Sequence, residues 1–288
     1  MNIEDKIYQK WLNAGISDNF IFSKTMETYP DLCRELLEKI LHIKIKEMSY
    51  PEREKVIESR LDSKGIRIDV YVEDEENRLF DIEMQISDVD KLEKRMRYYQ
   101  GMLDLDKLKR GAKYQTLGES YIIFICLFDY FGSGRHIYTF RERCEEDLKL
   151  KLNDGATKIF LNTEGNLDDV DEGLKAFLKY VAGHGVSDNF TEQIDKAVGV
   201  IKSGEKVRLE YMSLEVMIQE REDRAREEGR QEGREEGRQE GLQKGRQEGR
   251  FEMVKKMLNI NIPISQIMQI SGWTKEQILK LDEGNLSK

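Results

Sequence analysis

The fold is decided by two short stretches, Arg67-Ile-Asp-Val-Tyr-Val-Glu73 and Leu79-Phe-Asp-Ile-Glu-Met-Gln85. Apolar and polar residues alternate in both with a period of two, which is the period of a β-strand, and the acidic residues between them are typical of a turn. The alternation predicts a β-hairpin from Gly65 to Gln85 with one buried and one polar face. The predicted buried face holds Ile66, Ile68, Val70, Val72, Phe80, Ile82 and Met84.

The polar face brings two acids of adjacent strands together, Asp69 and Glu83. Residues opposite each other in a ladder lie within about 5.5 Å, and two carboxylates at that separation suit a hard cation such as Mg²⁺. Gln85 returns to the same face and can orient a water molecule for attack on a phosphate. On spacing alone, the commoner outcome is two solvated acids on the wet face of an acidic hairpin, so both interpretations stay open.

The rest of the first 218 residues predicts helices around a sheet. The stretch Tyr121–Phe128 is apolar on both faces, as in a central strand covered by helices. Asp31 is expected to cap a helix that contains Leu32, Leu36, Leu37, Ile40 and Leu41. Further strands are predicted at 136–140 and 158–161, and further helices at 88–103, 168–181 and 191–218. The fold class is therefore α/β.

Several motifs carry a family resemblance in this order: Asp18-Asn-Phe-Ile-Phe22, the two hairpin strands, Arg95, Tyr98-Tyr99, and the apolar strand. Over about residues 15–250 the chain resembles the Rpn family of recombination-promoting nucleases and transposases, a branch of the PD-(D/E)XK nuclease superfamily. The resemblance implies a restriction-endonuclease-like mixed sheet flanked by helices, with a divalent metal held at the hairpin.

The resemblance also implies roles for individual residues. Asp69 corresponds to the first metal carboxylate, Glu83 to the second, and Gln85 to the superfamily lysine, whose positive charge a glutamine lacks. Asp18 stands where a helical acid completes the metal shell in some relatives, although it is equally placed to cap the helix that starts at Asn19. Glu38, on the next predicted helix, is a weaker candidate ligand.

A basic segment follows the hairpin, with eight Lys and Arg residues against three acids between residues 91 and 113. Such a surplus suits contact with the phosphate backbone of DNA. The resemblance implies that Arg95 and Tyr98 face the site. The alternative is a solvated amphipathic helix, because Met96, Tyr99, Met102 and Leu103 give it an apolar side. The residues predicted to bind DNA are Lys91, Lys94, Arg95, Arg97 and Tyr98.

Residues 219–250 differ in composition from the rest of the chain. Glycines recur there every four residues from 229 to 249 among Glu, Arg and Gln. Each helical Gly costs about 1 kcal/mol relative to Ala, so an isolated helix is expected to be weak. Either the tract is a solvated linker or its glycines let a second helix approach and form a homo-oligomer. We predict three domains: a nuclease-like domain (1–218), this long charged helix (219–250), and a small helical module resembling a helix-turn-helix (251–288).

The composition narrows the function. The 288 residues are 36% charged with a net charge of -9, which argues against strong non-specific DNA binding. Three scattered cysteines and three histidines predict neither a disulfide framework nor a zinc site. No apolar run is long enough to span a membrane, and we expect a cytoplasmic protein. The expected function is a divalent-metal-dependent DNA endonuclease using Mg²⁺, Mn²⁺ or Ca²⁺ that promotes recombination or transposition. The alternative is a catalytically inactive DNA-binding or oligomerising protein that retains the fold.

Overall fold

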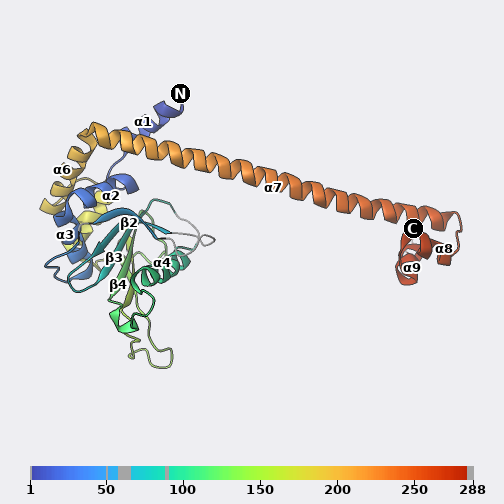
Figure 1. Ribbon diagram of the computed structural model, residues 1–288, viewed down its shortest axis with the longest axis horizontal. Coiled ribbons are helices and arrows are strands. Elements are labelled where there is room, and N and C mark those ends of the chain that lie inside the picture. The colour runs from blue at the N-terminus through green and yellow to red at the C-terminus, as the bar shows by residue number, and fades with distance from the viewer. Residues whose placement is uncertain (1, 50, 58–65, 88–90, 284–288) are drawn as a thin grey trace. The chain divides into compact units, whose positions relative to one another are not determined.

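The centre of the fold is a mixed β-sheet (Figure 1), seen in a computed structural model that describes residues 2–49, 51–57, 66–87 and 91–283. Within these residues the sheet has six strands in the order β1-β2-β3-β4-β6-β5. The pairs β3–β4 and β4–β6 are parallel, and the other neighbours are antiparallel. The strands are β1 (Glu52–Ile57), β2 (Ile66–Glu73), β3 (Leu79–Gln85), β4 (Ser120–Cys126), β5 (Ile137–Phe140) and β6 (Ala156–Asn162).

Helices cover both faces of this sheet (Figure 1). One face packs against α1 (Ile3–Asn13), α2 (Asn19–Thr28), α3 (Pro30–Leu41), α5 (Glu172–Val181) and α6 (Asn189–Ser203). The other face packs against α4 (Leu92–Lys107), whose buried residues are Leu92, Met96, Tyr99, Met102 and Leu103. The predicted α/β class with a mixed sheet flanked by helices is confirmed.

The hairpin forms as an antiparallel pair, and its predicted buried face is confirmed for Val70, Val72, Phe80, Ile82 and Met84 but wrong for Ile66 and Ile68. Ile66 and Ile68 pack on the side of α4, whereas Val70 and Val72 pack on the opposite side. The alternation therefore changes faces at Asp69. The register of β1 and β2 places Glu54 opposite this residue, and Glu54 has a left-handed backbone with φ of 54°. The paired strands are locally distorted at that point, which a strict period of two does not anticipate.

Other predicted elements form with small changes. The central strand is β4, which is buried along its whole length, and β5 and β6 lie where strands were predicted. The Asp31 cap is wrong: α3 begins at Pro30, two residues before the predicted start at Leu32, and Asp31 pairs with Arg34 inside the first turn. The helix predicted over 191–218 is interrupted at Gly204. Gly65 and residues 88–90, which belong to predicted elements, lie outside the described residues.

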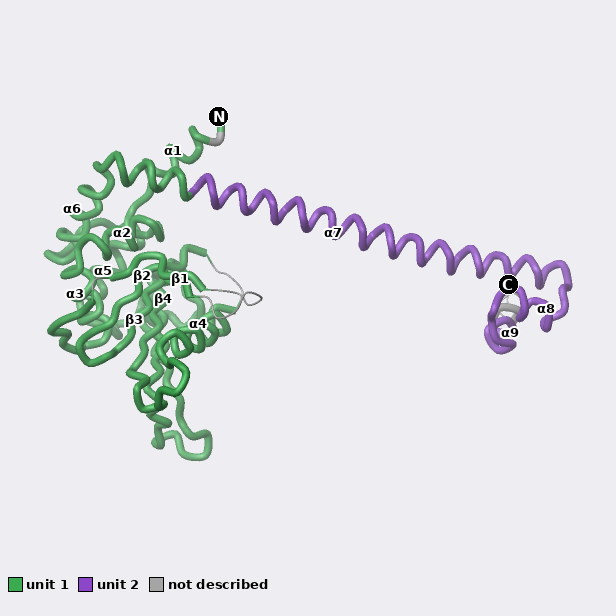
Figure 2. The backbone as a smooth tube through the Cα atoms, viewed as in Figure 1, with its two compact units in different colours: residues 1–214 green, residues 215–288 purple. Residues whose placement is uncertain are grey.

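The chain divides into two compact units, residues 1–214 and 215–288 (Figure 2). A long helix, α7 (Glu205–Asn259), runs from the first unit into the second and contains the whole glycine tract. The second unit ends with α8 (Ile264–Ser271) and α9 (Lys275–Glu283), which bury a small core of Val254, Ile267 and Ile278. A capping box forms at the start of α9, where Thr274 and Gln277 exchange hydrogen bonds of 2.9 and 3.3 Å.

A membrane crossing needs a long, apolar helix. Among the helices of the described part of the chain, none has the length and hydropathy to cross a bilayer.

Candidate active site

Two strands hold Asp69 and Glu83 against each other through a reciprocal pair of hydrogen bonds. The backbone N–H of Asp69 donates to Glu83 Oε1 at 3.0 Å, and the backbone N–H of Met84 donates to Asp69 Oδ2 at 3.1 Å. Each carboxylate is thus anchored on the backbone of the neighbouring strand. This brings the two predicted acids together on adjacent strands.

The site is buried. Asp69 is 8% exposed, Gln85 is 5% exposed and Glu83 is almost fully buried, because α4 lies over this side of the sheet. The interpretation of these acids as a solvated face is therefore wrong. Burying carboxylates is expensive unless they are paired or bind a cation. A buried acidic pair on a sheet is thus a candidate functional site.

The pKa values of both site carboxyls are raised. Burial raises the pKa of Asp69 to about 6, against the opposing effects of the Met84 N–H and the Arg95 charge. Burial, together with the neighbouring charges of Asp69 and Asp81, raises the pKa of Glu83 well above its ordinary value. A cation that shares both carboxylates removes the penalty of ionising them.

Arg95 brings a positive charge into the site from α4. Its guanidinium donates to Glu83 Oε2 at 2.5 Å and to Gln85 Oε1 at 3.0 Å. The same group bonds the hydroxyl of Tyr99 at 2.9 and 3.1 Å. Arg95 faces the site, as the resemblance implies, but Tyr99 rather than Tyr98 accompanies it. Tyr98 is 39% exposed on the outer side of the helix, where Lys91, Lys94 and Arg97 are exposed as well.

Asp18 caps α2. Its Oδ1 accepts the backbone N–H groups of Phe20 and Ile21 at 3.0 and 3.2 Å, and its Oδ2 accepts the hydroxyl of Tyr211 at 3.3 Å. The residue that α2 brings to the site is the next one, Asn19, whose Nδ2 donates to Asp69 Oδ2 at 3.2 Å.

Sequence reasoning missed Asn19 as a site residue. Its Oδ1 is buried and has no hydrogen-bond partner among the described residues. The available signal was its place at the start of the helix, directly after the predicted Asp18.

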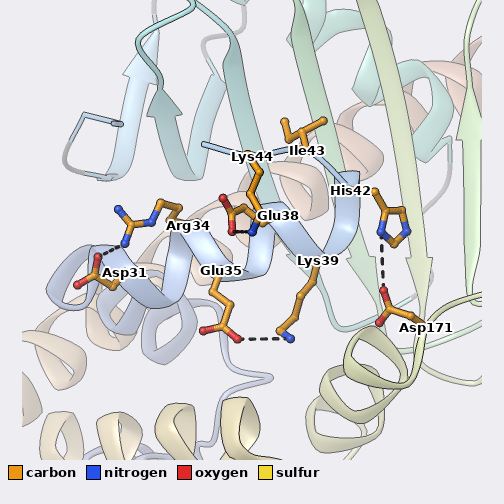
Figure 3. A pocket seen from close by; sticks show the side chains of 9 residues that line it. All are labelled: Asp31, Arg34, Glu35, Glu38, Lys39, His42, Ile43, Lys44 and Asp171. Carbon is orange, nitrogen blue, oxygen red and sulfur yellow. Dashed lines mark hydrogen bonds and ion pairs between the residues drawn. The ribbon is translucent and has the colours of Figure 1, made fainter. Parts of the chain in front are cut away.

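Glu38 lies in a different place, on α3 in a charged pocket of about 640 Å³ (Figure 3). Its Oε1 accepts the backbone N–H of Ile45 at 2.8 Å, and its Oε2 pairs with Lys44 at 3.3 Å. The pocket is lined by acids and bases in comparable numbers, several of which pair with each other (Figure 3). Glu38 stabilises the end of α3 and makes no contact with Asp69 or Glu83 in the described structure.

Asp81 is a second residue whose role the sequence does not reveal. It follows the same side of β3 as Glu83, is fully buried, and neither of its oxygens has a hydrogen-bond partner among the described residues. Burial and the charge of Asp69 raise the pKa of its carboxyl well above the ordinary value. Sequence alternation places Asp81 on a polar face, but only its cover by α4 makes it a buried acid.

The donor set suits a hard divalent cation. Asp69 and Glu83 offer carboxylate oxygens, and the orphaned Asn19 Oδ1 offers an amide oxygen. Mg²⁺ prefers such ligands and keeps several waters, so one or two carboxylates suffice. In the part of the chain that the structure describes, no group of three or more His, Cys, Asp or Glu side chains is arranged to hold a metal ion.

Comparison with known families agrees with this geometry. The model of the PD-(D/E)XK nuclease family transposases matches residues 20–174, which include the sheet strands and the paired acids. The chain belongs to this family. No curated protein and no solved structure gives a significant match. As a PD-(D/E)XK nuclease family transposase, the chain has the mixed sheet expected of that fold, and Asp69 and Glu83 lie on its antiparallel hairpin.

Proposed function

We propose that this protein is a DNA endonuclease that hydrolyses phosphodiester bonds with the help of a divalent cation and promotes recombination or transposition. Its family supports a nuclease- or transposase-like activity. The observation that carries the proposal is the buried, reciprocally bonded pair of Asp69 and Glu83 beside the guanidinium of Arg95.

Asp69 and Glu83 would hold the cation, with Mg²⁺ as the first choice and Mn²⁺ or Ca²⁺ as alternatives, and the Asn19 amide is placed to assist. Such a cation, when bound, makes a nearby water more acidic and offsets negative charge on the phosphate. Gln85 orients the attacking water through its side-chain amide.

Arg95 supplies the positive charge that Gln85 lacks. Its side chain is 36% exposed, so substrate can reach part of it, and its guanidinium is held in place by Glu83, Gln85 and Tyr99. A planar guanidinium binds phosphate oxygens with paired hydrogen bonds and stabilises charge that develops on them.

The outer side of α4 is the proposed DNA contact. Lys91, Lys94, Arg97 and Tyr98 are exposed there. Neutralising phosphates with such side chains releases counterions, so binding should weaken as salt rises. We further propose that the glycine tract of α7 assembles the chain into a homo-oligomer, which would let two sites act on two strands.

The test is plasmid nicking across Mg²⁺, Mn²⁺ and Ca²⁺ with the parent, Asp69→Ala and Glu83→Gln. We expect both variants to lose nicking by at least about 100-fold, while an exposed acid of α3, changed by Asp31→Ala, leaves it unaltered. Thermal melting verifies that the variants fold. Equal nicking by Asp69→Ala and the parent would remove the proposed site. Salt-sensitive DNA binding without cleavage at any cation would instead support an inactive, DNA-binding protein.

A further inference from the structure

Six aromatic side chains form a continuous cluster beside the candidate site, which we call the aromatic patch. Neighbouring ring centroids lie 4.8–6.4 Å apart, in tilted, edge-on and stacked pairs. The rings come from the segment after β4, from the edge strand β5 and from β6. They are Phe128, Tyr130, Phe131, Tyr138, Phe140 and Phe160.

Some rings of the patch are buried and others are exposed to solvent. Phe160 is 3% exposed, whereas Phe131 and Phe140 are 38% and 44% exposed. Phe131 contacts the rings of Tyr130, Tyr138, Phe140 and Phe160, so its position is fixed by packing and not by chance. Single exposed apolar residues are ordinary, but contiguous exposed rings on a rigid floor indicate a binding surface.

The patch adjoins the candidate site. In the parallel pair β3–β4, Glu83 is opposite Phe124 and Gln85 is opposite Cys126, and the segment that carries Phe128–Phe131 leaves β4 directly after that residue. Ligands of such sheets bind outside the carboxyl ends of the strands. The rings also form a path: Arg95 lies over Phe124 at 5.5 Å, and Phe124 contacts Phe160 at 5.8 Å.

Positive side chains flank the patch. The hydroxyl of Tyr130 donates to Glu93, which fixes the patch to the first turn of α4. Lys94 and Arg97 are exposed on α4, directly after Glu93 and one helical turn after it. The exposed Arg135 lies beside the patch, because its backbone N–H donates to the hydroxyl of Tyr138 at 3.2 Å, and its side chain pairs with Asp169 at 3.7 Å. Rings that stack with bases, next to cations that bind phosphates, are the recognition elements of single-stranded nucleic acid.

We propose that the aromatic patch binds unpaired bases of a single-stranded DNA segment next to the phosphodiester bond that the site cleaves. The proposed position next to the cleaved bond rests on the proposed nuclease function. Base binding by the patch is measured separately from cleavage. Bases in a duplex are stacked on each other and cannot cover the rings, so the patch selects frayed, looped or displaced strands. Phe131 and Phe140 are the stacking surfaces, and Tyr130 and Phe160 support them.

The test uses the full-length protein in EDTA with a single-stranded oligonucleotide containing 2-aminopurine, a base whose fluorescence falls when it stacks. We expect the parent to quench the probe, and Phe131→Ala and Phe140→Ala each to weaken binding about tenfold. Phe131→Tyr keeps a ring and should retain quenching. The matched control is Tyr8→Ala, which removes a ring from α1 that is 38% exposed, as Phe131 is, and should leave quenching unchanged.

Three results separate this proposal from the nuclease. Quenching that is absent or insensitive to Phe131→Ala overturns the aromatic patch, even where the parent nicks plasmid. Ring-dependent quenching without nicking at any cation supports the patch and overturns the nuclease. A lower mass in solution for Phe131→Ala shows that a second copy of the chain covers the rings, which also overturns the proposal.

Discussion

Arg95 and Glu83 form an ion pair of 2.5 Å between a helix and the strand beneath it. The Glu83 side chain is almost fully buried, with 1% exposed, whereas the Arg95 side chain is 36% exposed. Without a cation, Arg95 is the group that compensates Glu83. The two residues should therefore be coupled in the stability of the metal-free protein.

A double-mutant cycle of Arg95→Gln and Glu83→Gln measures this coupling. Either single change leaves a charged partner uncompensated. We expect each to lower the free energy of unfolding by about 1–3 kcal/mol, less than for a fully buried pair because Arg95 is partly exposed. The double variant should lose clearly less free energy of unfolding than the two single variants lose together. Urea unfolding in EDTA provides the measurement, with Arg97→Gln as control. Additive losses would show that the pair is not coupled.

The buried acids predict a falling stability with rising pH. A carboxyl whose pKa is higher in the folded than in the unfolded chain stabilises the fold at low pH, and that stability is lost as the pH rises through the folded value. For Asp69 the range runs from its ordinary 3.8 to about 6. In EDTA, we expect the melting temperature of the parent to fall across and above this range.

Asp81→Asn should flatten that dependence. The change removes the ionisable group from a fully buried site where both oxygens lack partners in the described structure. We expect the free energy of unfolding of the variant to exceed that of the parent by about 1–3 kcal/mol at pH 8. At pH 5 the two values should lie closer together. Calorimetry at both values suffices. An identical pH profile in variant and parent would show that Asp81 does not titrate against folding.

The variant Asp18→Ala distinguishes a role of Asp18 as helix cap from a role as metal ligand. Losing the cap of α2 should lower the free energy of unfolding by about 0.5–2 kcal/mol. Because both oxygens of Asp18 are engaged with α2 and Tyr211, the affinity for Mn²⁺ should not change. Asp171→Ala, which removes the matching cap of α5, is the control. A tenfold weaker Mn²⁺ affinity for Asp18→Ala alone, measured by titration calorimetry, would make Asp18 a ligand.

The glycine tract can be tested by changing its six glycines, at 229, 233, 237, 241, 245 and 249, to alanine. An added Cβ meets no atom within 4 Å at any of them, so each change should stabilise α7 by up to about 1 kcal/mol. Circular dichroism should show more helix at elevated temperature. If the glycines admit a second copy, the variant should also have a lower mass in light scattering than the parent. An unchanged oligomer would remove the tract as its basis.

The sequence by itself determined the local elements. Alternation with a period of two specified the hairpin, and continuous apolar character specified β4. These signals work because neighbouring side chains set strand and helix propensity within a few residues. The spacing of Asp69 and Glu83 also predicted that these two acids lie together on adjacent strands, as their reciprocal hydrogen bonds show.

Only the tertiary structure decided what covers those acids. Periodicity indicates which residues share a side of a strand, but not that α4 buries that side or that the alternation changes at Asp69. The contacts of Arg95 with Glu83 and of Asn19 with Asp69 join residues 12 and 50 positions apart. Such contacts depend on how helices pack on the sheet, and the same packing converts a polar strand face into a buried site, because exclusion of water is a property of the assembled layers and not of any one segment.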